Sequence, residues 1–381
     1  MATRGDRVRD LPTADPDRLW REALAAGLVG RSKAPLNCEV TPSMLAGEVT
    51  GEGQFFRRNH FPMPELDPGS WQLEVSGLVG RPLSLGLPDL CALPARSLTV
   101  TLECAGNGRT LFSPGVPGEA WALGAVSTAR WTGALLSDVL EEARILPSAR
   151  EAIFRGADAG PVAGLAEPIR FERSLPVEDA LESGALLAYE MNGQPLPVAH
   201  GFPVRLVVPG WYAVASVKWL AEITLTGQPF RGFFQDTHYV YEWRRDGHAE
   251  REPVRLQRVR AMIADPVAGT RVSASELEVT GVAWSGAAPV TRVEVRASRN
   301  GDHRRDGSAP AAAWQPAELV GTGSRYGWQP WRAVLRDLRA GPALLQARAA
   351  DAAGNDQLSA PEWNELGYGG NFVHEVPVTV G

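Results

Sequence analysis

The sequence of 381 residues has little cysteine, with only Cys38, Cys91 and Cys104. This odd and low number excludes a disulfide framework, and the lack of a Cys-x-x-Cys pair excludes the usual zinc-binding spacings. We expect Cys38 and Cys91 to be structural. Positive charge is also scarce, because 38 lysines and arginines face 44 aspartates and glutamates, a formal net charge of −6. That balance argues against a nucleic-acid partner.

Long hydrophobic runs are missing as well. No apolar stretch approaches the roughly 18 residues that a transmembrane helix needs. The polar residues 1–11 lack the apolar region of a signal peptide, and the Arg-Arg pairs lie far inside the chain, unlike a twin-arginine export signal. We therefore expect a cytoplasmic protein with no membrane partner.

Glycine (40) and proline (30) are abundant, yet 44% of the residues are hydrophobic, which is typical of a turn-rich and strand-rich globular protein. Near the N-terminus, residues 14–27 predict a helix, with Asp15 as its cap and Leu19, Trp20 and Leu24 on its apolar side. A second helix is predicted over residues 132–145 from the spacing of the apolar residues. Alternating or β-branched patterns predict strands at 71–77, 97–104, 151–158, 204–210 and 217–227.

The pattern changes after residue 258. Short alternating strands at 270–286, 289–298, 343–354 and 372–380 follow one another without a helix. This arrangement is typical of a β-sandwich of about 120 residues, plausibly immunoglobulin-like. The charged stretch around Pro253 marks the predicted boundary. We therefore expect an N-terminal extension (1–34), a mixed domain (35–258) and a β-sandwich (259–381).

The most informative segment is 99–109, TVTLECAGNGR, where a strand leads into Cys104, a glycine-rich turn and Arg109. A cysteine at a strand end with small residues after it suits a thiolate that reaches a metal or a large ligand. Arg109 would favour the thiolate or bind an anion beside it. Taken alone, such a cysteine is more often a buried structural residue.

Four strings decide between these interpretations: FFRRNHFPMP (55–64), CAGNGR (104–109), WALGAVSTARWTGALL (121–136) and AYEMNGQPLPVAHGFPVRLVVPGWYAVASVKWL (188–220). Together they resemble the sulfite oxidase family of molybdenum enzymes, which includes the molybdenum domain of plant-type nitrate reductase. The resemblance covers residues 35–381. It implies an α+β molybdopterin domain followed by an immunoglobulin-like dimerisation domain, and hence a homodimer.

The resemblance also assigns roles by position. It implies that Cys104 is the molybdenum ligand, consistent with the preference of soft metals for sulfur. Arg58 and Arg109 would bind the substrate oxyanion. The implied residues around molybdopterin are Phe56, Arg58, Asn59, His60, His200, Arg205, Ser216 and Lys218. Arginine and lysine suit a cofactor with an anionic phosphate.

Two aromatic residues match the substrate pocket of the family. Trp121 matches a tryptophan that lines the pocket, although a core tryptophan is nearly as plausible. Tyr239 matches an active-site tyrosine that could orient an oxyanion, and it lies 21 residues after Lys218, as the family spacing asks. Tyr241 is the alternative if the register differs by two residues.

The sequence departs from the family at two positions. Gly108 stands in CAGNGR where animal and plant members usually carry an arginine, and Leu366 stands where an arginine of the WNxRG motif reaches the anion site. Each charge-assisted hydrogen bond lost weakens anion binding by roughly 1.5–3 kcal/mol. Arg325 or Arg332 is a candidate for compensation.

The resemblance implies oxidation of sulfite to sulfate by oxygen-atom transfer. Because the chain has no haem-binding Cys-x-x-Cys-His motif, we expect no haem, and the electrons would pass to a separate acceptor. One alternative is another substrate with the same cofactor, as in a nitrate or sulfoxide reductase, which the residue at position 366 favours. The other is an inactive binding or assembly module with the same fold, which the presence of Cys104 disfavours.

Overall fold

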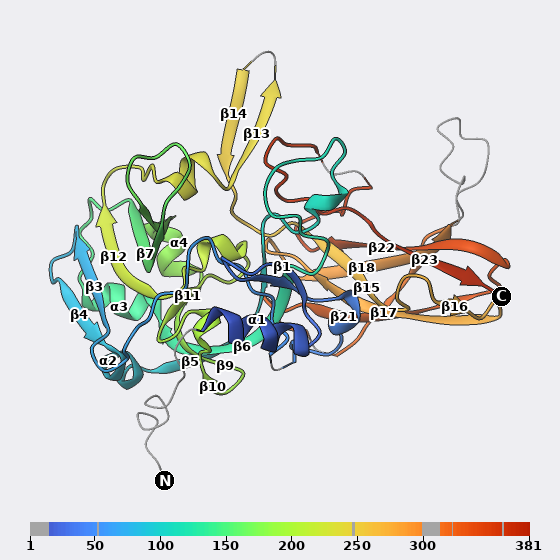
Figure 1. The fold of residues 1–381 in the computed structure, drawn as a ribbon, viewed down its shortest axis with the longest axis horizontal. Coiled ribbons are helices and arrows are strands. Elements are labelled where there is room, and N and C mark those ends of the chain that lie inside the picture. Colours follow the sequence, from blue (N-terminus) through green and yellow to red (C-terminus); the bar gives the residue numbers. More distant parts are fainter. Residues whose placement is uncertain (1–14, 52, 246–247, 299–312, 322, 360–361) are drawn as a thin grey trace, which may run out of the picture.

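The computed structural model describes residues 15–51, 53–245, 248–298, 313–321, 323–359 and 362–381. The molecule is elongated, with strands and short helices at one end and strands at the other (Figure 1). This is the α+β class with a strand-rich C-terminal part that the sequence predicts. No helix in these ranges is long and apolar enough to cross a membrane.

The first helix, α1 (Pro16–Ala25), begins where the sequence predicts. The carboxylate of Asp15 accepts hydrogen bonds from the backbone N–H groups of Asp17 and Arg18, which caps the helix. Its apolar side is narrower than expected, since Leu19 is buried but Leu24 is 45% exposed. The hairpin β1 (Val29–Ser32) and β2 (Asn37–Glu39) follows the helix. Buried residues of the helix and of β2 belong to an apolar cluster that also contains residues of the later strands β6 (Val126–Leu135), β15 (Arg260–Asp265) and β17 (Glu276–Trp284).

A five-stranded mixed sheet forms the outer part of the α+β end, in the order β4–β3–β12–β7–β8. Its strands are β3 (Gln72–Gly77), β4 (Leu83–Gly86), β7 (Glu151–Gly160), β8 (Ile169–Pro176) and β12 (Leu220–Thr226). β12 runs parallel to β3 and antiparallel to β7. Apolar side chains of this sheet, such as Leu73, Phe154 and Ile223, belong to the largest hydrophobic cluster. This sheet therefore backs the core against which the site residues are packed.

The second sheet has the order β10–β9–β6–β5, with β11 paired to β9. Its strands are β5 (Ala95–Glu103), β6 (Val126–Leu135), β9 (Leu186–Met191), β10 (Gln194–Pro195) and β11 (Arg205–Val207). The helices of this end are α2 (Leu87–Ala92), α3 (Leu136–Glu142) and α4 (Val177–Glu182). The helix predicted over 132–145 was too long, because residues 132–135 extend β6 and pair with both β5 and β9.

Short turns and one hairpin connect these sheets. The 3₁₀ turns are η2 (Pro42–Met44), η3 (Arg109–Leu111), η4 (Val198–His200) and η5 (Ala213–Ala215), and η6 (Phe233–Thr237) is a π-helical turn. From η6 the chain passes into a two-stranded ribbon, β13 (Val240–Arg245) and β14 (His248–Pro253), which stands out from the body in Figure 1. Tyr239 lies at the base of this ribbon.

The C-terminal part is a sandwich of two mainly antiparallel sheets. One has the order β15–β17–β21–β20 and the other β16–β23–β22–β18–β19. The strands are β15 (Arg260–Asp265), β16 (Arg271–Val272), β17 (Glu276–Trp284), β18 (Val290–Ser298), β19 (Gln315–Pro316), β20 (Glu318–Leu319), β21 (Gln329–Arg336), β22 (Gly341–Asp351) and β23 (His374–Val380). Alternate side chains, including Val279, Val295 and Leu345, fill a core of their own.

Candidate active site

Cys104 lies immediately after β5, at the start of the turn formed by residues 105–108. Its backbone is fixed on both sides, because its N–H donates to Ala125 O at 2.8 Å and its carbonyl accepts from Asn107 N at 2.9 Å. Gly108 closes the turn with a φ of +84°, a left-handed conformation that glycine adopts without strain. Burial raises the pKa of the Cys104 thiol, while Arg58 and Arg109 act in the opposite direction. The turn thus presents one buried sulfur within the electrostatic reach of two arginines.

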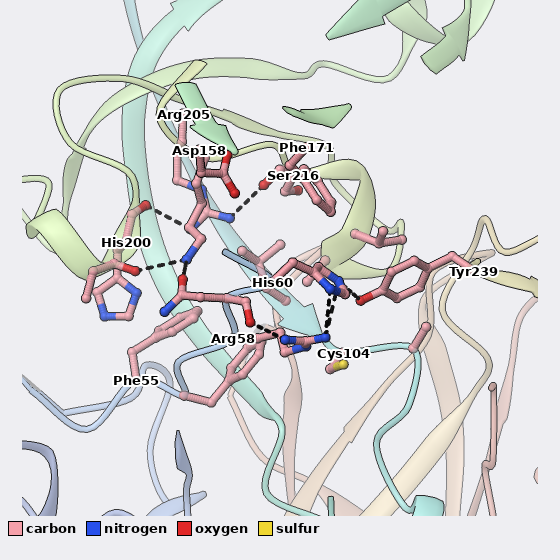
Figure 2. Close-up of a pocket in the computed structure, with 18 residues that line it drawn as sticks. Phe55, Arg58, His60, Cys104, Asp158, Phe171, His200, Arg205, Ser216 and Tyr239 are labelled. Carbon is pink, nitrogen blue, oxygen red and sulfur yellow. Dashed lines mark hydrogen bonds between the residues drawn. The ribbon is translucent and has the colours of Figure 1, made fainter. Parts of the chain in front are cut away.

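The thiol borders a cavity whose empty space, counted together with open solvent, amounts to about 670 Å³ (Figure 2). Of the residues that the sequence assigns to the site, those lining the cavity are Phe56, Arg58, Asn59, His60, Cys104, His200, Arg205, Ser216, Lys218 and Tyr239. Segments distant in the sequence therefore meet here. Arg109 and Trp121 are not among the lining residues.

The segment that carries Arg58 and His60 is fixed by the backbone. Arg57 exchanges two hydrogen bonds of 2.9 Å with Cys38 on β2, and the N–H of Asn59 donates to Asn37 Oδ1 at 2.8 Å. These contacts turn the Arg58 and His60 side chains toward the cavity, where both are drawn in Figure 2.

A short chain of polar contacts links Arg58, His60 and Tyr239. Arg58 Nη2 lies 3.0 Å from His60 Nδ1, and His60 Nε2 lies 2.6 Å from the Tyr239 hydroxyl. Arg58 Nη2 also lies 3.2 Å from His60 Nε2. In the tautomer that carries its hydrogen on Nε2, Nδ1 accepts from Arg58 and Nε2 donates to the phenol oxygen. Burial, followed by Arg58, lowers the pKa of His60 well below its usual value, so the ring is neutral. In that tautomer the hydrogen of the Tyr239 hydroxyl is available to a ligand.

Burial also raises the pKa of Tyr239, which keeps the phenol protonated at neutral pH. Its neighbour in sequence, Tyr241, does not line the cavity, and Arg258 lies over its ring at 4.6 Å. The structure therefore brings Tyr239, and not the alternative Tyr241, into the cavity.

Arg205, Lys218 and His200 lie at the other end of the cavity. Arg205 donates to the carbonyls of His200 and Ser216, each at 3.0 Å, and Lys218 Nζ donates to Asn59 Oδ1 and to Ala199 O. Burial lowers the pKa of Arg205 to about 9 and holds that of Lys218 well below its usual value, with Arg205 adding to the effect on Lys218. Burial likewise lowers the pKa of His200.

Gly201 lies tightly against the bases of the Arg205 and Lys218 side chains. It has a φ of +105°, and a Cβ there would lie 3.0 Å from the Cβ atoms of both Arg205 and Lys218. Ser216 contributes as a backbone clamp, because its hydroxyl accepts from Val208 N at 3.0 Å while its carbonyl accepts from Arg205.

Asp158, on β7, is a cavity residue that sequence reasoning missed. Burial raises its pKa to about 6, against the effect of Lys218, and its Oδ1 has no hydrogen-bond partner. The sequence offers one indication of this role, a carboxylate among apolar residues of the strand predicted over 151–158. Such a pattern does not identify a site residue until the fold is known. Phe55 and Phe171 were also missed; Phe171 stacks on His60 with ring centres 5.4 Å apart.

Arg109 is held just behind the cavity. Its Nη1 donates to Glu119 O at 3.1 Å and its Nη2 to Leu366 O at 3.0 Å, while its Nε has no partner. The guanidinium also lies 5.0 Å from the ring centre of Tyr368. Trp121 is fully buried in the same cluster as Cys104, and its Nε1 has no partner, so it occupies a core position beside the site.

Arg325 and Arg332, the candidates to compensate for the arginine absent at position 366, are not among the residues that line the cavity. Arg325 donates to the carbonyls of Gly286 and Ala287 on the sandwich, and Arg332 forms an exposed ion pair with Glu318. Both are fixed by local partners far along the chain from the Cys104 turn. Leu366 itself packs against the largest apolar cluster.

A buried ion pair joins the Cys104 turn to the sandwich. Arg260 Nη1, on β15, donates to Glu103 Oε1 at 2.8 Å, and both side chains are 2% exposed. Trp284 Nε1 donates to Glu103 Oε2 at 2.9 Å, and Asn107 Nδ2 donates to Oε1 at 3.0 Å. Because Glu103 immediately precedes Cys104, the sandwich helps to set the position of the sulfur.

The donor set fits a molybdenum cofactor. Cys104 offers one sulfur donor at the edge of the cavity, which suits a metal that a bound sulfur-containing molecule also holds. The cavity offers Arg58, Arg205 and Lys218 with Asp158 as the lining carboxylate. This excess of positive charge matches an anionic phosphate, and the unpartnered Asp158 oxygen matches a polar N–H group of a pterin.

Comparison with known proteins agrees with this geometry. Residues 60–234 match the oxidoreductase molybdopterin binding domain. Sulfite oxidase of Arabidopsis thaliana is 30% identical over 377 residues, which covers 92% of this chain and 93% of the relative. The chain belongs to the sulfite oxidase family.

Two other relatives extend the comparison. Mitochondrial sulfite oxidase of Mus musculus is 37% identical over 370 residues, and the chain spans 65% of the length of that relative. The crystal structure of the sulfane dehydrogenase SoxCD from Paracoccus pantotrophus matches with a TM-score of 0.78 at 27% identity, covering 91% of this chain and 85% of the other. The sulfite oxidase family thus accounts for both the molybdopterin domain and the sandwich.

Proposed function

We propose that this protein oxidises sulfite to sulfate, taking the oxygen atom from water and releasing two protons and two electrons. The observation that supports this most strongly is the row of Arg58, His60 and Tyr239 beside Cys104, which ends in the Tyr239 phenol. Such a row suits an anion that carries several oxygen acceptors.

Cys104 would hold molybdenum through its sulfur, and His200, Arg205, Lys218 and Asp158 would hold the molybdopterin. When bound, this group supplies two-electron oxygen-atom transfer. The remaining work belongs to the protein. Arg58 donates to the substrate oxyanion, and Arg109 adds positive potential from behind the cavity.

Tyr239 donates its hydroxyl hydrogen to a substrate oxygen and stays protonated because burial raises its pKa. His60 sets the direction of that hydrogen by donating to the phenol oxygen, and it remains neutral because its pKa is lowered. Phe171, stacked on His60, keeps water away from the imidazole. The arrangement is preorganised before the substrate enters, which is the main source of electrostatic stabilisation in such sites.

We further propose that the electrons pass to a separate acceptor and that the chain forms a homodimer through residues 259–381. An oxidised protein acceptor is not needed to test the reaction itself, because a small dye such as ferricyanide can take the electrons.

The experiment is a substrate panel of sulfite, nitrate and dimethyl sulfoxide, run on the full chain and on Tyr239→Phe. We expect turnover with sulfite and a loss of about tenfold to a hundredfold in kcat/KM for Tyr239→Phe, since one hydrogen bond to a charged group contributes roughly 1.5–3 kcal/mol. Tyr241→Phe is the matched variant two residues away and should change kcat/KM less than threefold. Reduction of nitrate or sulfoxide without sulfite oxidation would establish the alternative substrate class, which the Leu366 departure favours.

A further inference from the structure

Tyr239 has a backbone conformation that an aromatic residue rarely adopts. Its φ is +56°, in the left-handed region, where the side chain of a bulky residue crowds the backbone. Such a conformation persists only where neighbouring contacts hold it, and it is typical of functional sites. The hydrogen bond to His60 fixes only the end of the side chain, so the ring and the backbone need further support.

Tyr368 provides that support. Its ring stacks on the Tyr239 ring with centres 5.0 Å apart and planes 21° apart. Tyr368 is itself rigidly placed. Its N–H donates to Asn364 Oδ1 at 2.9 Å, its carbonyl accepts from Asn364 Nδ2 at 2.8 Å, and the next residue, Gly369, donates to Ala105 O at 2.8 Å.

The same ring also contacts Arg109, whose guanidinium carbon lies 5.0 Å from its centre. Glycines make this contact possible, because a Cβ at Gly106 or Gly118 would come within 3.0 Å of the guanidinium. Arg109 Nη2 donates to Leu366 O, two residues before Tyr368. The segment 364–369 therefore holds Arg109 by one carbonyl and one aromatic ring.

We propose that Tyr368 is a positioning residue of the oxyanion site, which holds the phenol of Tyr239 and the guanidinium of Arg109 in one arrangement. Position 366 carries leucine where the family motif carries an arginine, and this segment contributes a ring instead of a charge. The positive charge of Arg109 then contributes more to anion binding, because its contacts keep the guanidinium from moving away from the anion. This inference rests on the proposed function in so far as the anion is the substrate.

The test compares Tyr368→Leu, which removes the ring, with Tyr368→Phe, which keeps it. Tyr326→Leu is the matched control, because Arg325 lies 4.6 Å from the Tyr326 ring in a similar arginine–tyrosine contact and Tyr326 does not line the cavity. Each full-length variant is loaded with cofactor and its molybdenum content is measured. Binding of inorganic sulfate is then titrated by calorimetry, and KM and kcat are measured with sulfite.

We expect Tyr368→Leu to weaken sulfate binding and raise the KM for sulfite by about tenfold, since an aromatic stack and a cation–π contact are both lost. Tyr368→Phe and Tyr326→Leu should stay within threefold of the unchanged protein. Sulfate binding and KM that are unchanged in Tyr368→Leu at full molybdenum content would overturn the proposal. A Phe variant as impaired as the Leu variant would also overturn it, because the ring would then not be the operative feature.

Should Tyr368→Leu fail to fold, Tyr368→Phe decides by itself: near-normal sulfate affinity supports the proposal and a tenfold loss overturns it. The sulfate titration also separates this inference from the proposed function. Sulfate binding that depends on Tyr368 in a protein that does not oxidise sulfite would support the inference and refute the function. Sulfite turnover that is unchanged in the Tyr368 variants would support the proposed function and refute the inference.

Discussion

Replacing Arg260 with methionine should destabilise the protein by about 3–5 kcal/mol, because it removes one partner of a buried ion pair. The Arg260 and Glu103 side chains are each 2% exposed and lie 2.8 Å apart, so water cannot replace the lost guanidinium. Trp284 and Asn107 would still donate to the carboxylate, but neither carries a charge. The effect should reach the metal site, because Glu103 precedes Cys104.

The assay is urea unfolding of the full chain at neutral pH, together with molybdenum analysis of the same preparations. Arg332→Met is the matched control, because its ion pair with Glu318 has side chains that are 56% and 61% exposed. Exposed pairs of this kind contribute about 0–1 kcal/mol, so the control should unfold almost as the unchanged protein does. Arg260→Met should also retain less molybdenum. A cost for Arg260→Met below about 1 kcal/mol, similar to that of the control, would refute the reasoning.

Three further predictions follow from the same contacts. Cys104→Ser should leave a folded protein without molybdenum and without turnover; metal analysis and circular dichroism check this, and an active variant would contradict the ligand assignment. Burial raises the pKa of Asp158 from 3.8 to about 6, so the folded cofactor-free protein holds a proton that the unfolded chain releases, and its stability should fall as the pH rises through this interval. Asp158→Asn should remove that part of the decline in urea unfolding between about pH 4 and 7, and an unchanged slope would count against it. A chain truncated after residue 258 should be monomeric or aggregated by light scattering, whereas a well-behaved dimer would exclude the sandwich as the interface.

The sequence predicted much of this fold because its strongest signals are local. Asp15 and the apolar residues behind it predict α1, and strict alternation predicts strands such as β3 and β18. The end of β6 was missed, since residues 132–135 have helical spacing but pair with two neighbouring strands. Tertiary pairing overrides local periodicity in such a segment.

The site was predictable where its residues lie in recognisable strings. Cys104 and Lys218 are examples, and the cavity lies where those strings meet. Asp158 and Tyr368 were not predictable from the sequence. Asp158 reaches the cavity only because the fold places β7 beside it, and Tyr368 meets Tyr239 only because the fold brings the segment 364–369 against that residue. Arg109 shows a third case, in which the residue was identified but its backbone partners at Glu119 and Leu366 depend on the fold.

The central claim is that this cavity binds a molybdenum cofactor at Cys104 and oxidises sulfite. The most direct test is sulfite-dependent reduction of ferricyanide by protein from a cofactor-competent host, after its molybdenum content has been measured. The account predicts steady turnover in proportion to the bound molybdenum. Protein that is fully loaded with molybdenum and does not reduce ferricyanide with sulfite would contradict it.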